Sequence, residues 1–364
     1  MSGTPPLRAG VIGLGWAGQQ HMSAYATAEG VELVGLAGME ADALQQLGDT
    51  YAIAPGQRHA DWQQLVASGE LDLISIATPT TLHAPMAVAA LDAGLHVLSE
   101  KPMAENGTAA ATMVAAAARN DRVLDVSFNH RRRGDVAALK KIIDAGLLGD
   151  IYYAKAGWLR REGIPGLGSW FTRRATAGGG PLMDIGVHML DMALHLMGEP
   201  SAEAVSAATY AEFGPRGRGG SVDRPTVAPG EDGTVPFEVE DLSTAFVRLS
   251  GGRTLLLEAS WASYIKADEL YVVLYGSEGG AVLGSPGTWS RSELSVLTEV
   301  RGVPAELFPV LPEDGRHREA VDDFVVKVQS PDWSAFHGED ALTRALVVDA
   351  AYRSAREHRE VRLD

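Results

Sequence analysis

The sequence predicts an N-terminal α/β domain with a doubly wound parallel sheet, followed by a second domain with an open, mainly antiparallel sheet. Three observations predict this fold class. Apolar strand-like segments alternate with helical segments over the first third of the chain, which is the pattern of βαβ units. From Ile151 the pattern changes to alternating strands, several of them joined by glycine turns. At 364 residues, the chain is also too long for one ordinary core. We place the domains at residues 1–128 and 129–364.

The composition sets broad limits on function. Hydrophobic residues make up 46% of the chain and charged residues 21%, as in soluble globular proteins. The absence of cysteine excludes disulfides and thiolate metal sites, and it fits a reducing, cytoplasmic location. We expect neither a secretory leader nor a membrane-spanning segment. The formal charge of −16 argues against affinity for nucleic acid or for an anionic membrane.

The first predicted strand, Arg8 to Ile12, runs into a glycine-rich turn. The turn is Gly13-Leu14-Gly15-Trp16-Ala17-Gly18, and it is followed by a helix from Trp16 to Ala28 and a strand from Glu32 to Ala37. Such a turn lets the backbone approach a pyrophosphate, which the helix N-terminus binds. Because the whole βαβ unit is present, we predict a dinucleotide site. Its expected contacts are Gly13, Gly15, Trp16, Ala17 and Gly18.

The end of the second strand bears on the choice between NAD and NADP. A carboxylate there usually binds the ribose 2′-hydroxyl, whereas an arginine accommodates a 2′-phosphate. Here the position is Gly38, followed by Met39 and Glu40, and the next basic residue is Arg58. Glu40 either reaches the ribose or faces water as an acidic residue at a helix N-terminus. We therefore prefer NAD mildly and keep NADP as the alternative, with Gly38 and Glu40 in the predicted cofactor site.

Two further strands, Leu71 to Ala77 and His96 to Ser99, end in polar turns. Ligands of doubly wound sheets bind at the carboxyl ends of the strands. We therefore expect the nicotinamide end of the cofactor near the residues that follow: Thr78, Pro79, His83, Glu100 and Lys101. Lys101 is either a proton donor or acceptor in a cleft or a solvated surface lysine. Pro102 raises the possibility of a cis bond that aims this lysine. The other predicted elements are helices from His83 to Ala93 and Asn106 to Arg119, and a strand from Arg122 to Phe128.

The segment from Gly178 to Gly198 predicts a buried helix over residues 181–197. Pro181 suits a first helical turn, and the residues that follow are apolar on almost every side. Four polar residues nevertheless fall in one stripe by their spacing: Asp184, His188, Asp191 and His195. Buried carboxylates and imidazoles are costly unless they are paired or used. For Asp191 and His195 we expect hydrogen bonds to the neighbouring domain. A shared metal site is the alternative, which we do not favour because a single straight helix cannot surround an ion.

The rest of the second domain is expected to be strands with three further helices. The Gly- and Pro-rich stretch Gly214 to Pro236 is either a loop that closes over a substrate or a plain insertion. The predicted strands are Ile151 to Trp158, Val205 to Glu212, Val239 to Leu249, Thr254 to Trp261, Glu269 to Tyr275 and Ala281 to Leu283. The predicted helices are Asp135 to Ala145, Gly315 to Val328 and Glu339 to His358.

Taken together, these motifs resemble the Gfo/Idh/MocA oxidoreductases, the glucose–fructose oxidoreductase and inositol dehydrogenase family. The resemblance covers essentially the whole chain. It is carried by GLGWAG, by ATPTTLH at 77–83, by SEKP at 99–102, by GGGPLMDIGVH at 178–188 and by the tail from Glu339. The sequence departs from the family at Gly38, where many members have an acidic residue. The resemblance implies an NAD(P)-dependent enzyme that transfers hydride between nicotinamide and a secondary alcohol of a sugar, a cyclitol or a derivative. It also implies a homodimer or homotetramer formed through the C-terminal sheet.

The resemblance assigns a catalytic group to Lys101, Asp184 and His188. An imidazole near neutral pKa suits removal of the hydroxyl proton, a carboxylate one turn away orients and balances charge, and a lysine supports the substrate oxygen. We expect His188 to act as general base, Lys101 as oxygen partner and proton relay, and Asp184 to bind and orient substrate. The residues in stretches that approach the substrate in relatives are Asn129, Arg131, Trp158, Arg160, Trp170 and Phe171. Core packing or dimer contacts explain the tryptophans about as well.

Two other functions remain open from the sequence. Some relatives use bound NAD transiently to cleave glycosidic bonds, so that the net reaction is hydrolysis. A non-catalytic regulator with the same nucleotide pocket is the other alternative, since fold alone does not settle function. The presence of Lys101, Asp184 and His188 together argues against a regulator, which has no need of a proton relay.

Overall fold

The computed structural model describes residues 5–221, 235–284, 293–312 and 315–363. The chain forms two compact units. The first consists of Met1–Asn129 and Gly315–Leu342, and the second of His130–Asp314 and Thr343–Asp364. Of the predicted loop from Gly214 to Pro236, residues 222–234 lie outside the described residues. Among the described helices, none is long and apolar enough to cross a membrane.

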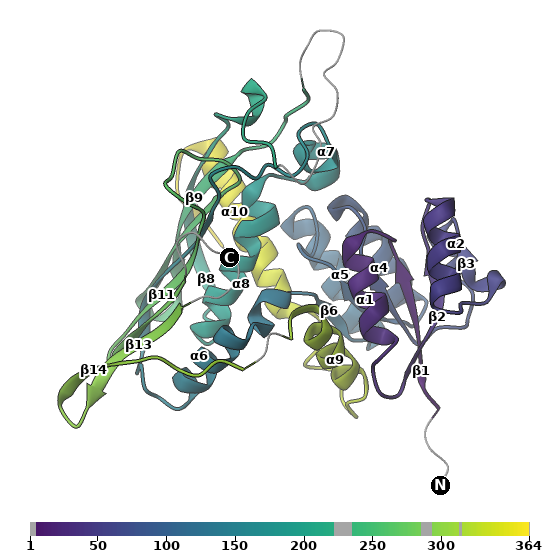
Figure 1. Ribbon diagram of the computed structural model, residues 1–364, viewed down its shortest axis with the longest axis horizontal. Helices are drawn as coiled ribbons and strands as arrows, with labels where there is room; N and C mark the ends of the chain where they lie inside the picture. The colour runs from purple at the N-terminus through teal and green to yellow at the C-terminus, as the bar shows by residue number, and fades with distance from the viewer. Residues whose placement is uncertain (1–4, 222–234, 285–292, 313–314, 364) are drawn as a thin grey trace. The chain divides into compact units, whose positions relative to one another are not determined.

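The first unit is built on a six-stranded parallel sheet with the order β3-β2-β1-β4-β5-β6 (Figure 1). The predicted doubly wound sheet is confirmed, and the strand order reverses at β1 and β4, where such sheets bind ligands. The strands are β1 Leu7–Ile12, β2 Val31–Ala37, β3 Arg58–His59, β4 Leu73–Ile76, β5 His96–Ser99 and β6 Leu124–Val126. The helices are α1 Trp16–Tyr25, α2 Ala41–Thr50, α3 Trp62–Val66, α4 His83–Asp92, α5 Gly107–Asn120 and α9 Arg316–Val328.

Helix α9 belongs to the core of this first unit, although it lies far away in the sequence. Its buried residues Val321, Phe324 and Val328 join the same hydrophobic cluster as Met22 and Tyr25 of α1, and α1 and α9 are in contact (Figure 1). The predicted boundary, which placed residues 129–364 in one domain, therefore differs from this division at residue 129 and over 315–342. The apolar stripe of α9 indicates that one of its faces is buried, but the stripe does not say against which partner.

The second unit contains a nine-stranded sheet with the order β14-β13-β12-β11-β7-β10-β9-β8-β15. Every pairing is antiparallel except that of β7 with β10, which confirms the predicted mainly antiparallel sheet. Strands β13, β14 and β15 were not expected from the sequence. The strands are β7 Ile151–Leu159, β8 Ala202–Tyr210, β9 Leu242–Leu249, β10 Arg253–Ser260, β11 Glu269–Gly276, β12 Gly279–Gly284, β13 Glu293–Val300, β14 Val303–Leu307 and β15 Val361–Arg362.

The predicted buried helix differs from a regular α-helix in its first turn. A π-helical segment, η5 Leu182–Gly186, precedes helix α8 Val187–Leu196. The Glu240 carboxylate accepts the N–H groups of Gly180 at 3.0 Å and Leu182 at 3.2 Å, so the start of the helix is held from outside. Such π-turns are frequent at functional sites. The remaining helices are α6 Gly134–Asp144, α7 Arg174–Ala177 and α10 Glu339–Glu357, the last of which begins in the first unit.

Candidate active site

The three glycines of the turn after β1 differ in what a side chain would meet at each position. Gly13 has φ +101°, and a Cβ there would lie 2.2 Å from the Ala77 carbonyl oxygen. A Cβ on Gly18 would lie 1.9 Å from the Gly13 carbonyl oxygen, whereas a Cβ on Gly15 would meet nothing within 4 Å. Gly13 and Gly18 are thus required by the protein's own backbone, and open space lies in front of Gly15, which caps α1 without a side-chain hydrogen bond. This arrangement fits a dinucleotide diphosphate at the helix N-terminus.

The end of β2 explains why this chain has glycine at position 38. A Cβ on Gly38 would lie 2.4 Å from the Leu14 side chain, so Leu14 occupies the space that a larger residue would need. The same position lies 3.4 Å from the Glu40 carboxylate. Glu40 therefore directs a carboxylate back to the end of β2, where an acidic side chain of other doubly wound enzymes meets the ribose.

The turn after β5 combines a buried carboxylate with the predicted lysine. The Lys101–Pro102 peptide bond is cis, as was considered from the sequence. Glu100 is 7% exposed, and its carboxylate accepts the backbone N–H of Lys101 at 3.2 Å and lies 3.1 Å from His21 Nε2. Burial alone would raise the pKa of Glu100, but His21, with His317 and Lys101, lowers that pKa to about 2. Glu100 is therefore an anion around which this turn is organised.

His83 joins two of the predicted cofactor turns. It is 1% exposed. Its Nδ1 lies 2.8 Å from the Pro102 carbonyl oxygen and its Nε2 lies 2.9 Å from that of Thr78. Burial lowers the pKa of His83 and so favours the neutral imidazole. A neutral imidazole has one N–H, so it donates to only one of the two carbonyl oxygens at a time. These contacts give His83 a role in connecting the two turns, and its contact with the cofactor stays a prediction, as does that of Pro79.

In the second unit, Asp184 and His188 lie among aromatic groups. Trp261 Nε1 donates to Asp184 Oδ2 at 3.0 Å. The ring of His188, which is 6% exposed, lies 4.3 Å from the ring of His130 and 6.2 Å from that of Trp158, centroid to centroid. The structure thus brings together two of the predicted site residues, His188 and Trp158.

Arg160 extends this aromatic cluster. Its guanidinium carbon lies 5.0 Å above the Trp158 ring, and His130 lies 5.3 Å from the same ring. Sequence reasoning missed two residues, His130 in this cluster and Trp261, which donates to Asp184. His130 stands between the selected residues Asn129 and Arg131, and a histidine at that place was a usable signal of acid–base chemistry. Trp261 follows a buried strand, where a tryptophan is unremarkable in sequence.

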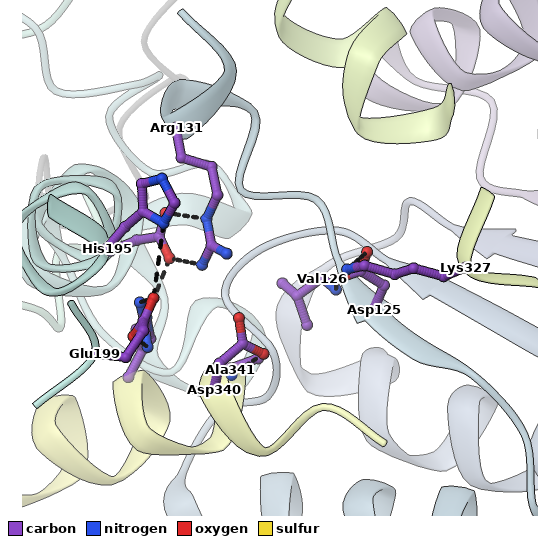
Figure 2. Close-up of polar contacts among 10 residues, drawn as sticks. Asp125, Val126, Arg131, His195, Glu199, Lys327, Asp340 and Ala341 are labelled. Atoms are coloured by element: carbon purple, nitrogen blue, oxygen red, sulfur yellow. Dashed lines mark hydrogen bonds and ion pairs between the residues drawn. The ribbon is translucent and has the colours of Figure 1, made fainter. Parts of the chain in front are cut away.

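The other half of the polar stripe forms an ion-pair network that runs from the buried Asp191 to the exposed Glu199 (Figure 2). Arg131 Nε lies 3.0 Å from Asp191 Oδ2, and Arg344 Nε lies 3.1 Å from Asp191 Oδ1. Glu199 pairs with Arg344 at 2.6 Å and with His195 at 3.8 Å. The expectation that Asp191 and His195 bond to the neighbouring domain is wrong, because these partners belong to the same compact unit. Arg131 has a structural partner here, and its predicted contact with substrate stays a prediction.

Two further site predictions, Trp170 and Asn129, have other contacts in the structure. Trp170 stacks on Phe171 at 3.8 Å in the segment η4 Trp170–Thr172, and Trp170 is 37% exposed. Asn129 belongs to the first unit, where its Nδ2 lies 3.1 Å from the ring nitrogens of His317. Their contacts with substrate stay predictions. Among the described residues, no group of three or more His, Asp or Glu side chains is arranged to hold a metal ion.

The first unit has a glycine turn suited to a dinucleotide. The second unit carries imidazole and carboxylate groups that can serve proton transfer. This combination is typical of nicotinamide-dependent oxidoreductases. The sequence matches two family models, the oxidoreductase family with an NAD-binding Rossmann fold over residues 7–128 and the GFO/IDH/MocA C-terminal domain over residues 136–282. The chain belongs to the Gfo/Idh/MocA oxidoreductase family, as its motifs suggested.

Known members of the family resemble it over most of its length. The D-glucoside 3-dehydrogenase of Escherichia coli (strain K12) is 31% identical over 96% of this chain and 95% of its own. The levoglucosan dehydrogenase of Pseudarthrobacter phenanthrenivorans is 31% identical over 80% of this chain and 76% of its own. A solved levoglucosan dehydrogenase in complex with NADH and L-sorbose is 26% identical, with a TM-score of 0.81, over 99% of this chain and 100% of that one.

Proposed function

We propose that the protein is an NAD(P)-dependent dehydrogenase that transfers hydride between nicotinamide and a secondary alcohol of a sugar, a cyclitol or a derivative. Glucosides and anhydrosugars are the first candidates, because two relatives that are 31% identical over 80% or more of the chain are named as dehydrogenases of a glucoside and of levoglucosan. The single observation that carries the proposal is this similarity together with the presence of Lys101, Asp184 and His188.

Each of these side chains has a separate task in the proposed reaction. The cofactor supplies the hydride acceptor, nicotinamide C4. His188 takes the proton of the substrate hydroxyl, a task for which a buried imidazole is suited. Asp184, fixed by the Trp261 indole N–H, orients the substrate. Lys101, held after the buried Glu100, supports the substrate oxygen as it becomes a carbonyl and relays the proton.

The cluster of Trp158, Arg160 and His130 supports the proposed substrate class. A tryptophan face with a guanidinium above it combines an apolar surface with donors in a plane, which suits the faces and the hydroxyl groups of a sugar ring. We propose Trp158, Arg160, Asp184 and His188 as substrate contacts. Asn129, Arg131 and Trp170 complete the proposed set.

For the cofactor we propose NAD in preference to NADP. The support is the carboxylate of Glu40, which lies close to the end of β2. A carboxylate there accepts from a ribose 2′-hydroxyl and repels a 2′-phosphate. The nearest arginine along the chain, Arg58, uses its guanidinium on the Ile53 carbonyl oxygen at 2.6 Å and on Asp49 at 2.6 Å.

The proposal extends to assembly and location. One face of the nine-stranded sheet carries stacked Tyr153 and Tyr275, with Lys155 within 5.8 Å of both rings. We propose that this face pairs with a second copy in a homodimer or homotetramer, which light scattering after gel filtration would measure. The proposed location is the cytoplasm, which cell fractionation would test.

The test begins with protein freed of bound nucleotide. NADH and NADPH are titrated separately while tryptophan fluorescence is followed, with Trp16 in the glycine turn as the expected reporter. A panel of glucosides, anhydrosugars and cyclitols is then offered with the preferred cofactor. Replacing Lys101 with Ala should abolish turnover and leave cofactor affinity nearly intact. Folded, nucleotide-free protein that binds neither cofactor would overturn the proposal. Cofactor binding without turnover of any compound in the panel would favour a regulator, and sugar release without net NADH would favour a glycosidase.

A further inference from the structure

The helix α9 lies outside both regions matched by the family models, which end at residue 128 and resume at 136–282. It nevertheless brings a histidine to the glycine turn. The ring of His317 lies 5.0 Å from the ring of Trp16, at an interplanar angle of 88°. Both residues belong to the first compact unit. A residue far away in the sequence thus lies next to the turn that begins the predicted cofactor site.

The polar surroundings of His317 are also parts of the predicted cofactor and substrate site. Asn129 Nδ2 lies 3.1 Å from the imidazole nitrogens, and His317 Nε2 lies 4.0 Å from Glu100 Oε1. The His21 ring, which shares Glu100, lies 6.4 Å away. When one ring nitrogen accepts from Asn129, a neutral imidazole carries its N–H on the other. The distance to Glu100 is longer than a hydrogen bond, so Glu100 does not use this donor directly.

Helix α9 holds His317 in a fixed place. Phe324 and Val321 are fully buried against the core of the first unit. Lys327 Nζ lies 2.5 Å from Asp125 Oδ2 on β6 (Figure 2). The helix is therefore held both by its apolar face and by its last turn. The position of His317 depends on the helix as a whole rather than on one contact.

Trp16 gives a second sign that a ligand belongs here. The residue is 66% exposed. It directly follows Gly15, where a Cβ would meet nothing within 4 Å. A large exposed indole next to such a space is suited to covering a bound molecule. Burial lowers the pKa of His317, so the imidazole is neutral at pH 7 and offers a directed N–H rather than a mobile charge.

We propose that His317 is a cofactor-contact residue, which hydrogen-bonds the part of NAD(H) between the diphosphate and the nicotinamide ribose while its ring stays against Trp16. This inference rests on the proposed function, because it takes the dinucleotide as the ligand of the first unit. It gives the first turn of α9 a role in the cofactor site, while the rest of the helix packs in the core.

The test is calorimetric titration of NADH into nucleotide-free protein. His317→Asn is compared with His358→Asn, an exposed histidine at the end of α10 where asparagine is accepted at φ +53°. Asparagine is too short to keep the contact with Trp16. We expect His317→Asn to raise the Kd for NADH by about tenfold or more and His358→Asn to leave it unchanged. His317→Phe keeps a ring against Trp16 but lacks ring nitrogens, and it should show the same loss.

The place of the contact is tested with a shorter ligand. AMP lacks the second phosphate and the nicotinamide riboside, so wild type and His317→Phe should bind it alike. Equal NADH affinity of wild type and folded His317→Phe would overturn the inference, and so would an equal loss of AMP binding. These results differ from failure of the proposed function, in which wild-type protein itself binds neither NADH nor NADPH.

Discussion

The two ends of one helix differ in how the protein treats buried charge. Asp184 accepts the indole N–H of Trp261, and the ring of His188 lies next to the rings of His130 and Trp158. Asp191, less than three turns further on, is fully buried between the guanidinium groups of Arg131 and Arg344. In sequence the four polar residues of the stripe look equivalent. The difference teaches that the partners brought to a polar group, rather than its spacing in the sequence, distinguish Asp191, which two arginines neutralise, from Asp184.

The largest effect is expected at His188. Replacing His188 with Asn removes the proposed base and should lower kcat by about 10²- to 10⁴-fold, while the thermal midpoint changes by only a few degrees. His195→Asn, on the same stripe but paired with Glu199 at 3.8 Å, is the matched control and should keep its kcat. Steady-state kinetics and calorimetry measure both. A His188→Asn variant with wild-type kcat would remove the distinction between the two ends.

The second effect is the reverse, a loss of stability without loss of chemistry. Asp191→Asn leaves Arg131 and Arg344, which are both largely buried, without their shared anion. Breaking a buried ion pair from one side costs about 3–5 kcal/mol of unfolding free energy. Denaturant titration should show this loss, and kcat per folded molecule should stay near that of wild type.

Asp92→Asn is the control for that experiment. Asp92 pairs with Arg119 at 2.5 Å, but the side chains are 46% and 48% exposed, and such surface pairs contribute about 0–1 kcal/mol. Equal losses for Asp191→Asn and Asp92→Asn would show that the network at the end of α8 is not the structural element proposed here.

Replacing Trp261 should give a smaller effect, which we expect in KM rather than in kcat or in the free energy of unfolding. Trp261→Phe removes the N–H that holds Asp184, a hydrogen bond to a charged group worth about 1.5–3 kcal/mol. We expect a rise in KM of about tenfold, since Asp184 is proposed to orient the substrate. Trp333→Phe is a matched control, because the Trp333 N–H donates at the same 3.0 Å to a backbone carbonyl, that of Val328. If both variants changed KM alike, Asp184 would not need Trp261 for orientation.

Much of the fold could be predicted because its signals are local. The parallel strands are short apolar runs that end in glycine or polar turns, and β5 has the bounds that were expected, His96–Ser99. The π-helical turn at Leu182–Gly186 could not be predicted, since it depends on Glu240 from a distant strand end. The place of α9 in the first unit depends on packing partners about 300 residues away in sequence, which periodicity does not identify.

The candidate site shows the same division. Motifs selected Lys101, Asp184 and His188, because specific residue types recur at fixed spacings. Nothing in the spacing distinguished Asp191 from Asp184, since the arginines that neutralise Asp191 come from positions 131 and 344. Likewise His130 and Trp261 became visible only as neighbours in space. Long-range partners, rather than the identity of the residue itself, decide these roles.

The smallest expected effect is a pH dependence of stability that comes from Glu199, in the ion-pair network of Asp191. Burial alone would raise the pKa of Glu199, but its contacts with His195 and Arg344 lower that pKa to about 2 from an ordinary value of 4.5. A carboxylate with a lowered pKa in the folded state stabilises the protein above pH 4.5 and loses that contribution as the pH falls towards 2. Wild type should therefore exceed Glu199→Gln in thermal midpoint at pH 7, and the gap should close below pH 4.5.

Glu360→Gln, which breaks the exposed pair with Arg248, should show a smaller gap. A gap that stayed constant to pH 3 would mean that Glu199 supports α8 through packing and not through its charge, and the contrast between the two ends would then rest on Asp191 alone.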